Sequence, residues 1–252
     1  MKHAPWKSPS LIPHIRCKDC PVRQHIICAN CGPSELEKLD AIKTNITFQA
    51  GQTIVYAGDK VEFFGFVMRG VAALSRNLID GRRQMVGLLL PPDFIGRLRQ
   101  EVSPFDVDAV SEVTICQFPK PQFEALVLSS PALERRLLEN ALDELDAARE
   151  WMLLLGRKTA REKVSSLLVL IARYDAAMNE HSPADGYFFP VLLKRETMAE
   201  YLGLTIETVS RQFSALKNDG IIVLDDSQHI CVPDFAMLLN EAGDDSDGGI
   251  IS

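Results

Sequence analysis

Long apolar runs are missing from this 252-residue sequence. The longest, such as Val86–Pro92 and Met152–Leu155, are far shorter than the roughly 20 residues that a membrane-spanning helix needs. The N-terminal segment before Cys17 also lacks the apolar stretch that a secretory signal contains. A hydrophobic fraction of 46% still allows a packed core. We therefore expect a folded cytoplasmic protein with no membrane segment.

Positive charge is scarce as well. The chain has 27 Lys and Arg against 34 Asp and Glu, for a net charge of −7. This balance argues against a protein that is basic throughout and wraps nucleic acid, although it allows a local basic surface. The usual enzyme signatures are absent too: no Gly-rich dinucleotide loop follows a strand, and there is no nucleophile elbow. We do not expect an enzyme.

The cysteines are distributed unevenly along the chain. Four of the six cysteines lie close together as Cys17, Cys20, Cys28 and Cys31, in two Cys-x2-Cys pairs. In a cytosolic chain this crowding indicates metal or redox chemistry before disulfides. Two such pairs suit a structural zinc site, although the gap of seven residues between them is short for a zinc ribbon. An iron–sulfur cluster is the alternative, because four thiolates hold it as well.

The two remaining cysteines lie in predicted strands. Cys116 alternates with Val113 and Ile115, so its side chain should face away from both. Taken alone, a single strand cysteine of this kind is predicted to be a core residue rather than a ligand. Cys231 is likewise predicted to be a buried apolar residue.

The remaining pattern predicts an α+β fold whose parts follow one another along the chain. Short strands with glycine punctuation fill residues 45–120, and Asp80-Gly81 marks a hairpin, which together indicate a β-sandwich or roll. We assign a cysteine-rich segment, a β-roll, a long helix, a C-terminal helical domain and a disordered acidic tail. Their predicted bounds are residues 1–33, 34–128, 129–156, 157–240 and 241–252.

The long helix is predicted to begin with Ser130 as its N-cap and Pro131 as its first residue, and to end at Gly156. Four apolar residues follow a heptad seam along it: Leu138, Leu142, Leu145 and Met152. The seam could pack on its own domain. We favour a homodimer interface, because a helix that follows a β-roll has few other apolar surfaces to cover.

Residues 195–213 carry a helix-turn-helix pattern. Ala199 suits the close approach of two helices, Gly203 the turn, and Val209 the buried side of the second helix, which Thr205 caps. This arrangement leaves Glu207, Ser210 and Arg211 facing outward. Arginine can bond guanine O6 and N7, and a carboxylate can accept from cytosine N4, so we predict base readout in the major groove of double-stranded DNA. The alternative is an ordinary solvated helix face.

Two basic groups accompany the motif. Phosphate contacts are expected from Lys194, Arg195, Arg211 and Lys217. The group Arg157, Lys158, Arg161 and Lys163 is predicted to be a solvated face. Residues 180–190 are predicted to form a loop, and residues 221–224 and 229–232 the strands of a wing.

These features together resemble the oxygen-responsive FNR branch of the cyclic-AMP-receptor/FNR superfamily, and within it the FnrL and FnrN group. The resemblance is carried by the cysteine segment and by GRRQMVGLLLPPDFIG, DELDAAREWMLLLGRKTAREK and YLGLTIETVSRQ, which span nearly the whole chain. It implies a β-roll like a cyclic-nucleotide-binding jelly roll, a dimerisation helix and a winged helix-turn-helix.

The resemblance also implies a function and a site. A [4Fe–4S] cluster would be held by Cys17, Cys20, Cys28 and Cys116, and would stabilise the dimer when oxygen is absent. Cys31 is an additional cysteine and the alternative third ligand. Glu207, Ser210 and Arg211 would read a TTGAT-type inverted repeat, in a regulator of anaerobic or microaerobic genes. A zinc-stabilised regulator without oxygen sensing is the other possibility.

Two partner expectations follow from the same resemblance. The Asn77–Arg83 hairpin is a candidate contact for RNA polymerase. Relatives that bind cyclic nucleotide carry an Arg-Ser pair in the roll, whereas FIGRLRQEVSPFDVDAV has none here. We therefore expect no bound cyclic nucleotide.

Overall fold

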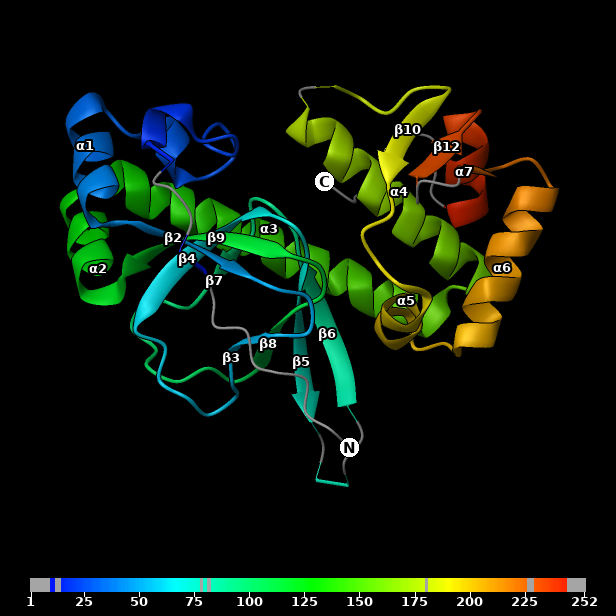
Figure 1. Cartoon of the computed structure of the whole chain (residues 1–252), viewed down its shortest axis with the longest axis horizontal. Helices are drawn as coiled ribbons and strands as arrows, with labels where there is room; N and C mark the ends of the chain where they lie inside the picture. Colours follow the sequence, from blue (N-terminus) through cyan, green and yellow to red (C-terminus); the bar gives the residue numbers. More distant parts are fainter. Residues whose placement is uncertain are drawn as a thin grey trace. The chain divides into compact units, whose positions relative to one another are not determined.

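The computed structural model describes residues 10–11, 15–77, 79–80, 83–179, 181–225 and 229–243. The chain divides into two compact units, residues 1–141 and 142–252, which are described separately (Figure 1). None of the helices in the described ranges is long and apolar enough to cross a membrane.

The first unit is a β-roll of two antiparallel sheets. One sheet has the strand order β1-β2-β9-β4-β7 and the other β3-β8-β5-β6. The strands are β1 (Ser10–Leu11), β2 (Thr44–Phe48), β3 (Thr53–Val55), β4 (Phe63–Arg69), β5 (Ala72–Asn77), β6 (Arg83–Leu89), β7 (Phe94–Ile95), β8 (Asp106–Ala109) and β9 (Val113–Pro119). The roll predicted from the strand pattern is therefore present.

The core of the roll lies between these sheets. Phe48, Val113 and Ile115 of the first sheet pack with Ala72 and Val107 of the second. Because side chains alternate along a strand, the neighbours of these residues project from the opposite face. Two helices contact β9 there, α1 (Pro33–Ile42) and α2 (Lys120–Ser129). Neither helix was predicted from the sequence.

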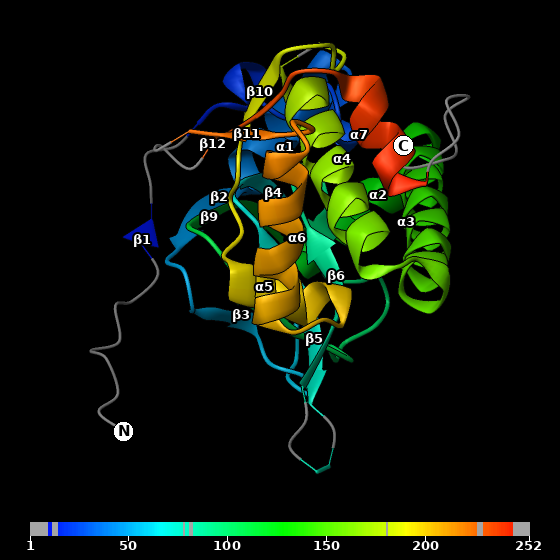
Figure 2. The ribbon, with the colours of Figure 1, turned by 90° about the vertical axis from the view of Figure 1, so that its right-hand side faces the viewer.

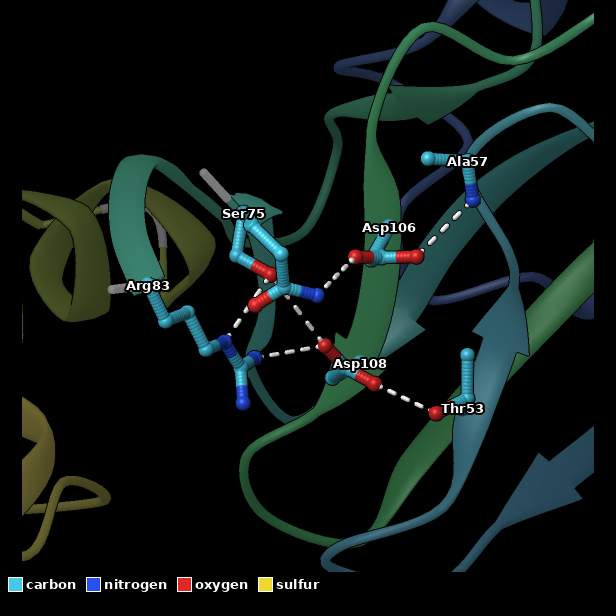
Figure 3. Close-up of polar contacts among 7 residues, drawn as sticks. Thr53, Ala57, Ser75, Arg83, Asp106 and Asp108 are labelled. Atoms are coloured by element: carbon cyan, nitrogen blue, oxygen red, sulfur yellow. Dashed lines mark hydrogen bonds and ion pairs between the residues drawn. The ribbon is translucent and has the colours of Figure 1, made fainter. Parts of the chain in front are cut away.

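The hairpin of β5 and β6 is braced next to its turn by a polar network on the outer face of the sheet (Figure 3). The guanidinium of Arg83 lies 2.6 Å from the Asp108 carboxylate, which also accepts from the Thr53 hydroxyl at 2.6 Å. Asn77 donates to Asp106 at 3.1 Å. The hairpin itself, proposed as a polymerase contact, lies partly outside the described residues, at 78, 81 and 82.

Helix α3 (Pro131–Arg157) begins in the first unit and ends in the second. Its predicted start at Pro131 is confirmed. Its predicted end is wrong by one residue: Gly156 does not adopt the left-handed conformation of a helix terminus, and the helix continues to Arg157. Leu133 and Leu137 are buried in the first unit, and Leu154 is buried in the second.

In its described residues, the second unit has four helices after α3 and a three-stranded sheet ordered β10-β12-β11 (Figure 2). Its elements are α4 (Ala160–Met178), β10 (Tyr187–Pro190), α5 (Arg195–Leu202), α6 (Ile206–Asn218), β11 (Val223–Leu224), β12 (His229–Val232) and α7 (Phe235–Ala242). The second predicted wing strand is confirmed with its bounds, whereas the first is present but begins at Val223, two residues later than predicted.

Two expectations for the second unit need correction. Tyr187–Pro190 is not part of a loop but pairs with β12 as an edge strand, because buried Phe189 anchors it and Pro190 stands at its end. Helix α7 runs two residues beyond the expected boundary at 240, since buried Ala242 belongs to it. Residues 244–252 of the predicted tail lie outside the described residues.

Candidate functional site

Five of the six cysteines belong to the first unit, and all six are free thiols. Cys17 begins a short 3₁₀ turn that Cys20 ends, and Cys28 lies in a second such turn that Cys31 ends. Cys20 is half-buried and the other four are buried. Cys116 projects from β9 on the side away from Val113 and Ile115, as strand alternation predicted. It is thus not part of the roll core.

Electrostatic contacts show which thiols come together. The Cys28 thiol interacts first with Cys31, through a hydrogen bond, and then with Cys17 and Cys116, while Cys116 interacts with Cys17 and Cys20. We call Cys17, Cys20, Cys28 and Cys116 the cysteine group. Cys31 adjoins the group through Cys28, its other neighbours are Glu35 and Arg23, and its thiol donates to the Ile27 carbonyl at 3.6 Å.

The thiols of the cysteine group are held in their protonated form. Burial raises the pKa of Cys17 to about 11 and that of Cys116 to about 12, and Lys43 opposes both shifts. A hydrogen bond to Cys31, followed by burial, raises the pKa of Cys28. A metal or cluster that binds here must therefore displace protons from its ligands.

The last turn of α1 positions the cysteine group. The Asp40 carboxylate accepts a hydrogen bond from the backbone N–H of Cys17 at 2.7 Å, and lies 3.3 Å from the ammonium of Lys43. The Lys43 side chain is only 1% exposed and donates to the Ile15 carbonyl. A buried cation therefore lies beside a set of thiols that become anionic when they bind a metal.

These residues fit an iron–sulfur cluster by chemistry. The donor set is entirely thiol, and two buried donors near it, Arg23 Nε and the Asn45 amide, have no hydrogen-bond partner within the described part of the chain. Among those same residues, no three His, Cys, Asp or Glu side chains converge on a single metal ion. A cluster does not require such convergence, because its thiolates are attached to different iron atoms.

Glu35 connects the cysteine segment to the start of α3. Its carboxylate accepts from the backbone N–H of Gly32 at 2.8 Å, directly after Cys31. A hydrogen bond from the Ser130 hydroxyl lowers the pKa of Glu35, and Ser130 immediately precedes the first residue of α3. One carboxylate thus joins the two segments.

The helix-turn-helix has the predicted local geometry. Gly203 ends α5 with a φ of +62°, which is cheap only for glycine. The Thr205 hydroxyl accepts from the backbone N–H of Thr208 at 3.2 Å and so caps α6. Ala199 and Val209 are buried, as expected for the contact between the two helices.

Glu207, Ser210 and Arg211 are all exposed on α6. They lie at positions i, i+3 and i+4, so they share one face of the helix. A hydrogen bond from its own backbone N–H lowers the pKa of the Glu207 carboxyl, and the Thr205 hydroxyl contributes second. The carboxyl is therefore an ionised acceptor at neutral pH. The same face continues to exposed Lys217.

Several basic residues have roles other than those predicted. The Arg195 guanidinium stacks on the Phe213 ring, 3.2 Å from its centroid, and so joins α5 to α6, a contact that the sequence did not predict. Arg161 pairs with Asp219 at 2.7 Å and with Glu241. Lys158 donates to the Ala242 carbonyl at 2.8 Å. The predicted solvated face is therefore wrong for Lys158 and Arg161, which make contacts within the unit, whereas Arg157 is exposed as predicted.

Removing the cap of α6 tests this local account. Thr205→Ala should lower the free energy of unfolding by about 1 kcal/mol, because one backbone donor loses its acceptor. Ser214→Ala is the matched control, since its exposed hydroxyl bonds only the Ser210 carbonyl inside the helix. Urea unfolding of the whole chain measures both. Equal losses in the two variants would contradict the role assigned to Thr205.

Sequence reasoning missed Glu35, Asp40, Lys43 and Asn45. Each has an ordinary polar side chain in a segment without a motif, so only the folded arrangement reveals its neighbours. The one available signal was the charge pair Asp40 and Lys43, three residues apart near a helix end.

Comparisons with known proteins agree with this architecture. Residues 45–130 match the cyclic nucleotide-binding domain, and residues 162–241 match the Crp-like helix-turn-helix domain. The chain is 54% identical over 235 residues to the transcriptional activator protein FnrL of Cereibacter sphaeroides, covering 93% of this chain and 95% of that protein. It is 40% identical over 220 residues to a probable transcriptional activator of Rhizobium leguminosarum bv. viciae, covering 87% and 90%.

A solved structure gives the same result. FixK2 from Bradyrhizobium japonicum matches with a TM-score of 0.69 at 27% identity, covering 79% of this chain and 96% of that one. The roll, the long helix and the helix-turn-helix therefore occur in a known combination, and the sequence identity to FnrL decides the branch. This chain belongs to the FNR branch of the cyclic-AMP-receptor/FNR superfamily of transcription regulators.

Proposed function

We propose that this protein is an oxygen-sensing regulator of anaerobic or microaerobic gene expression. In this proposal a [4Fe–4S] cluster is bound by Cys17, Cys20, Cys28 and Cys116, and it stabilises a homodimer that reads a TTGAT-type inverted repeat. The observation that carries the proposal is the position of Cys116. It is buried on the outer side of β9, in electrostatic contact with the N-terminal thiols.

The choice of the third ligand is supported by the neighbours of each thiol. Cys28 interacts with Cys17 and Cys116 in addition to its hydrogen bond with Cys31, whereas the thiol of Cys31 donates to the Ile27 carbonyl at 3.6 Å. These neighbours support Cys28, rather than Cys31, as the third ligand of the proposal. When bound, the cluster supplies an air-labile link between the N-terminal segment and β9.

The chain's own contacts provide a route from the cysteine segment to the dimer helix. Glu35 accepts hydrogen bonds from Gly32 on one side and from Ser130 on the other. Fixing the segment therefore holds the residue that precedes α3. When the cysteine segment is released, the N-terminal end of α3 is no longer held. A small shift of that end changes the orientation of the apolar seam toward a second subunit.

The apolar side chains of the α3 seam are exposed to the degree expected of a subunit interface. Leu138, Leu142, Leu145 and Met152 are 61%, 51%, 45% and 63% exposed, which is high for large apolar side chains along one stripe. Acidic residues lie on or beside it: Asp143, Glu144, Asp146 and Glu150. Like charges on two facing copies oppose pairing, so the dimer is only marginally stable. A modest free energy from ordering the cysteine segment is then enough to shift the equilibrium between monomer and dimer.

A seam substitution tests the dimer. Leu142→Lys should weaken self-association of the cluster-loaded protein about 100-fold, because a charge replaces an apolar contact on both copies. Ala147→Lys is the control, since Ala147 is exposed on the same helix away from the seam. Analytical ultracentrifugation under nitrogen measures both variants. Unchanged association of Leu142→Lys would show that α3 does not form the interface.

DNA recognition in the proposal uses the exposed face of α6. Arg211 bonds the guanine of the half-site, Glu207 accepts from amino groups of the opposite strand, and Ser210 contacts a thymine. The two half-sites should lie about 34–36 Å apart, one turn of DNA. RNA polymerase contact at the Asn77–Arg83 hairpin and the absence of cyclic nucleotide binding are further parts of the proposal.

Cofactor analysis under nitrogen tests the sensor. Protein prepared without air should be brown and contain iron and sulfide in equal amounts, and its visible absorption should bleach in air. Colourless anaerobic protein with stoichiometric zinc would instead identify a zinc-stabilised regulator. That result would remove the oxygen sensor and leave the DNA-binding account in place.

A further inference from the structure

Asn45 lies directly beside the distant cysteine of the group. It is the Cα partner of Cys116 in the antiparallel pairing of β2 and β9. Residues opposite one another in such a pair project from the same face of the sheet. Ile115 packs in the roll core, and Asn45 and Cys116 project from the opposite face of the sheet. The Asn45 side chain is therefore a neighbour of the Cys116 side chain.

The Asn45 amide is buried and unsatisfied. The residue is only 3% exposed, and neither Nδ2 nor Oδ1 has a hydrogen-bond partner among the residues that the structure describes. Thr47, two residues further along the same face, shares a 3.0 Å hydrogen bond with Thr114. Native proteins rarely leave a buried amide unpaired, because this costs about 1–3 kcal/mol. The unpaired amide marks a position where an acceptor is required.

Lys43 adds a charge at the same place. Its side chain is buried, and it interacts electrostatically with Cys17, Cys20 and Cys116. Four thiolates carry more negative charge than the iron–sulfur core offsets, so the group they hold is an anion. A buried ammonium is costly unless it faces such an anion. Asp40, which pairs with Lys43 at 3.3 Å, is itself partly exposed.

We propose that Asn45 donates a hydrogen bond to a sulfur atom of the bound iron–sulfur group and that Lys43 supplies its buried counter-charge. This inference rests on the proposed function. Hydrogen bonds to sulfur and nearby positive charge stabilise the electron-rich sulfurs, and so make the group harder to oxidise. The two residues therefore set how quickly oxygen acts, without being ligands.

Asn45→Leu separates this role from a structural one, because leucine has a similar volume and no donor. Cluster-free Asn45→Leu should melt at the wild-type temperature or above, since the variant removes an unpaired buried amide. Cluster-loaded Asn45→Leu should lose its visible absorption about tenfold faster than wild type at fixed dissolved oxygen. Lys43→Met should bleach faster as well, and Lys43→Arg should restore the wild-type rate by restoring the charge.

Thr47→Val is the matched control on the same strand and face. It should lower the melting temperature with and without the cluster and leave the bleaching rate unchanged. The inference is overturned if Asn45→Leu bleaches at the wild-type rate, or if it destabilises the cluster-free protein as Thr47→Val does. The two failures can be told apart by the wild-type protein. If anaerobically prepared wild type contains no iron and sulfide, the proposed function is wrong and this inference fails with it, whatever the variants do.

Discussion

Replacing Arg211 with alanine is expected to lower the affinity for the inverted repeat about 1,000-fold. Each subunit loses a bidentate contact to guanine, worth about 1–3 kcal/mol, and the dimer loses two of them. Affinity for unrelated DNA should fall much less, because phosphate contacts supply that binding. Fluorescence anisotropy at one fixed salt concentration, with the cluster-loaded protein and both DNA sequences, measures the two affinities.

Lys217→Ala is the control for Arg211→Ala. Lys217 is exposed on the same face of α6, further from its N-terminus, and is expected to contact phosphate. Its loss should weaken binding to both DNA sequences by the same factor and reduce the salt dependence of binding. If Arg211→Ala shows this uniform pattern instead, Arg211 is a phosphate contact and the readout assigned to α6 is wrong.

Serine substitution of the second cysteine pair should have opposite effects at its two positions. Cys28→Ser is expected to abolish iron and sulfide binding, because a hydroxyl is a far weaker ligand for iron in a cluster than a thiolate. Cys31→Ser should retain the wild-type content, since its thiol donates to the Ile27 carbonyl and is not in the cysteine group. Chemical analysis of iron and sulfide after anaerobic purification compares the two variants.

The reverse outcome would assign the third ligand to Cys31. Cys116→Ser extends the test to β9 and should lose the cluster as completely as Cys28→Ser. Retention of iron and sulfide by Cys116→Ser would show that the N-terminal cysteines suffice, and would separate the cysteine segment from the roll.

Local signals explain what the sequence could predict. Gly203 and Thr205 act within a few residues of themselves, so the helix-turn-helix could be predicted from its own segment. Strand alternation likewise placed Cys116 on the face away from Ile115. The start of α3 followed from Ser130 and Pro131. Each of these features depends on backbone preference or periodicity over a short window.

What could not be predicted depends on contacts between distant residues. Asn45 and Cys116 are partners only because β2 pairs with β9 in one register. The stacking of Arg195 on the Phe213 ring likewise depends on how α5 packs against α6. Helices α1 and α2 are short and have no strong hydrophobic pattern, so the local sequence does not predict them. The surroundings of the candidate cluster site therefore required the fold, whereas the family resemblance alone implied Cys116 as one of its ligands.

The most direct test of the central claim compares one preparation on its palindrome before and after controlled exposure to air, together with its sedimentation. The account predicts that the cluster-loaded protein is a dimer that binds the palindrome. Once iron is lost, the protein should be a monomer with at least tenfold weaker affinity for the DNA, because binding to one half-site no longer favours binding to the other. Equal affinity and an unchanged dimer in iron-free protein would contradict the account.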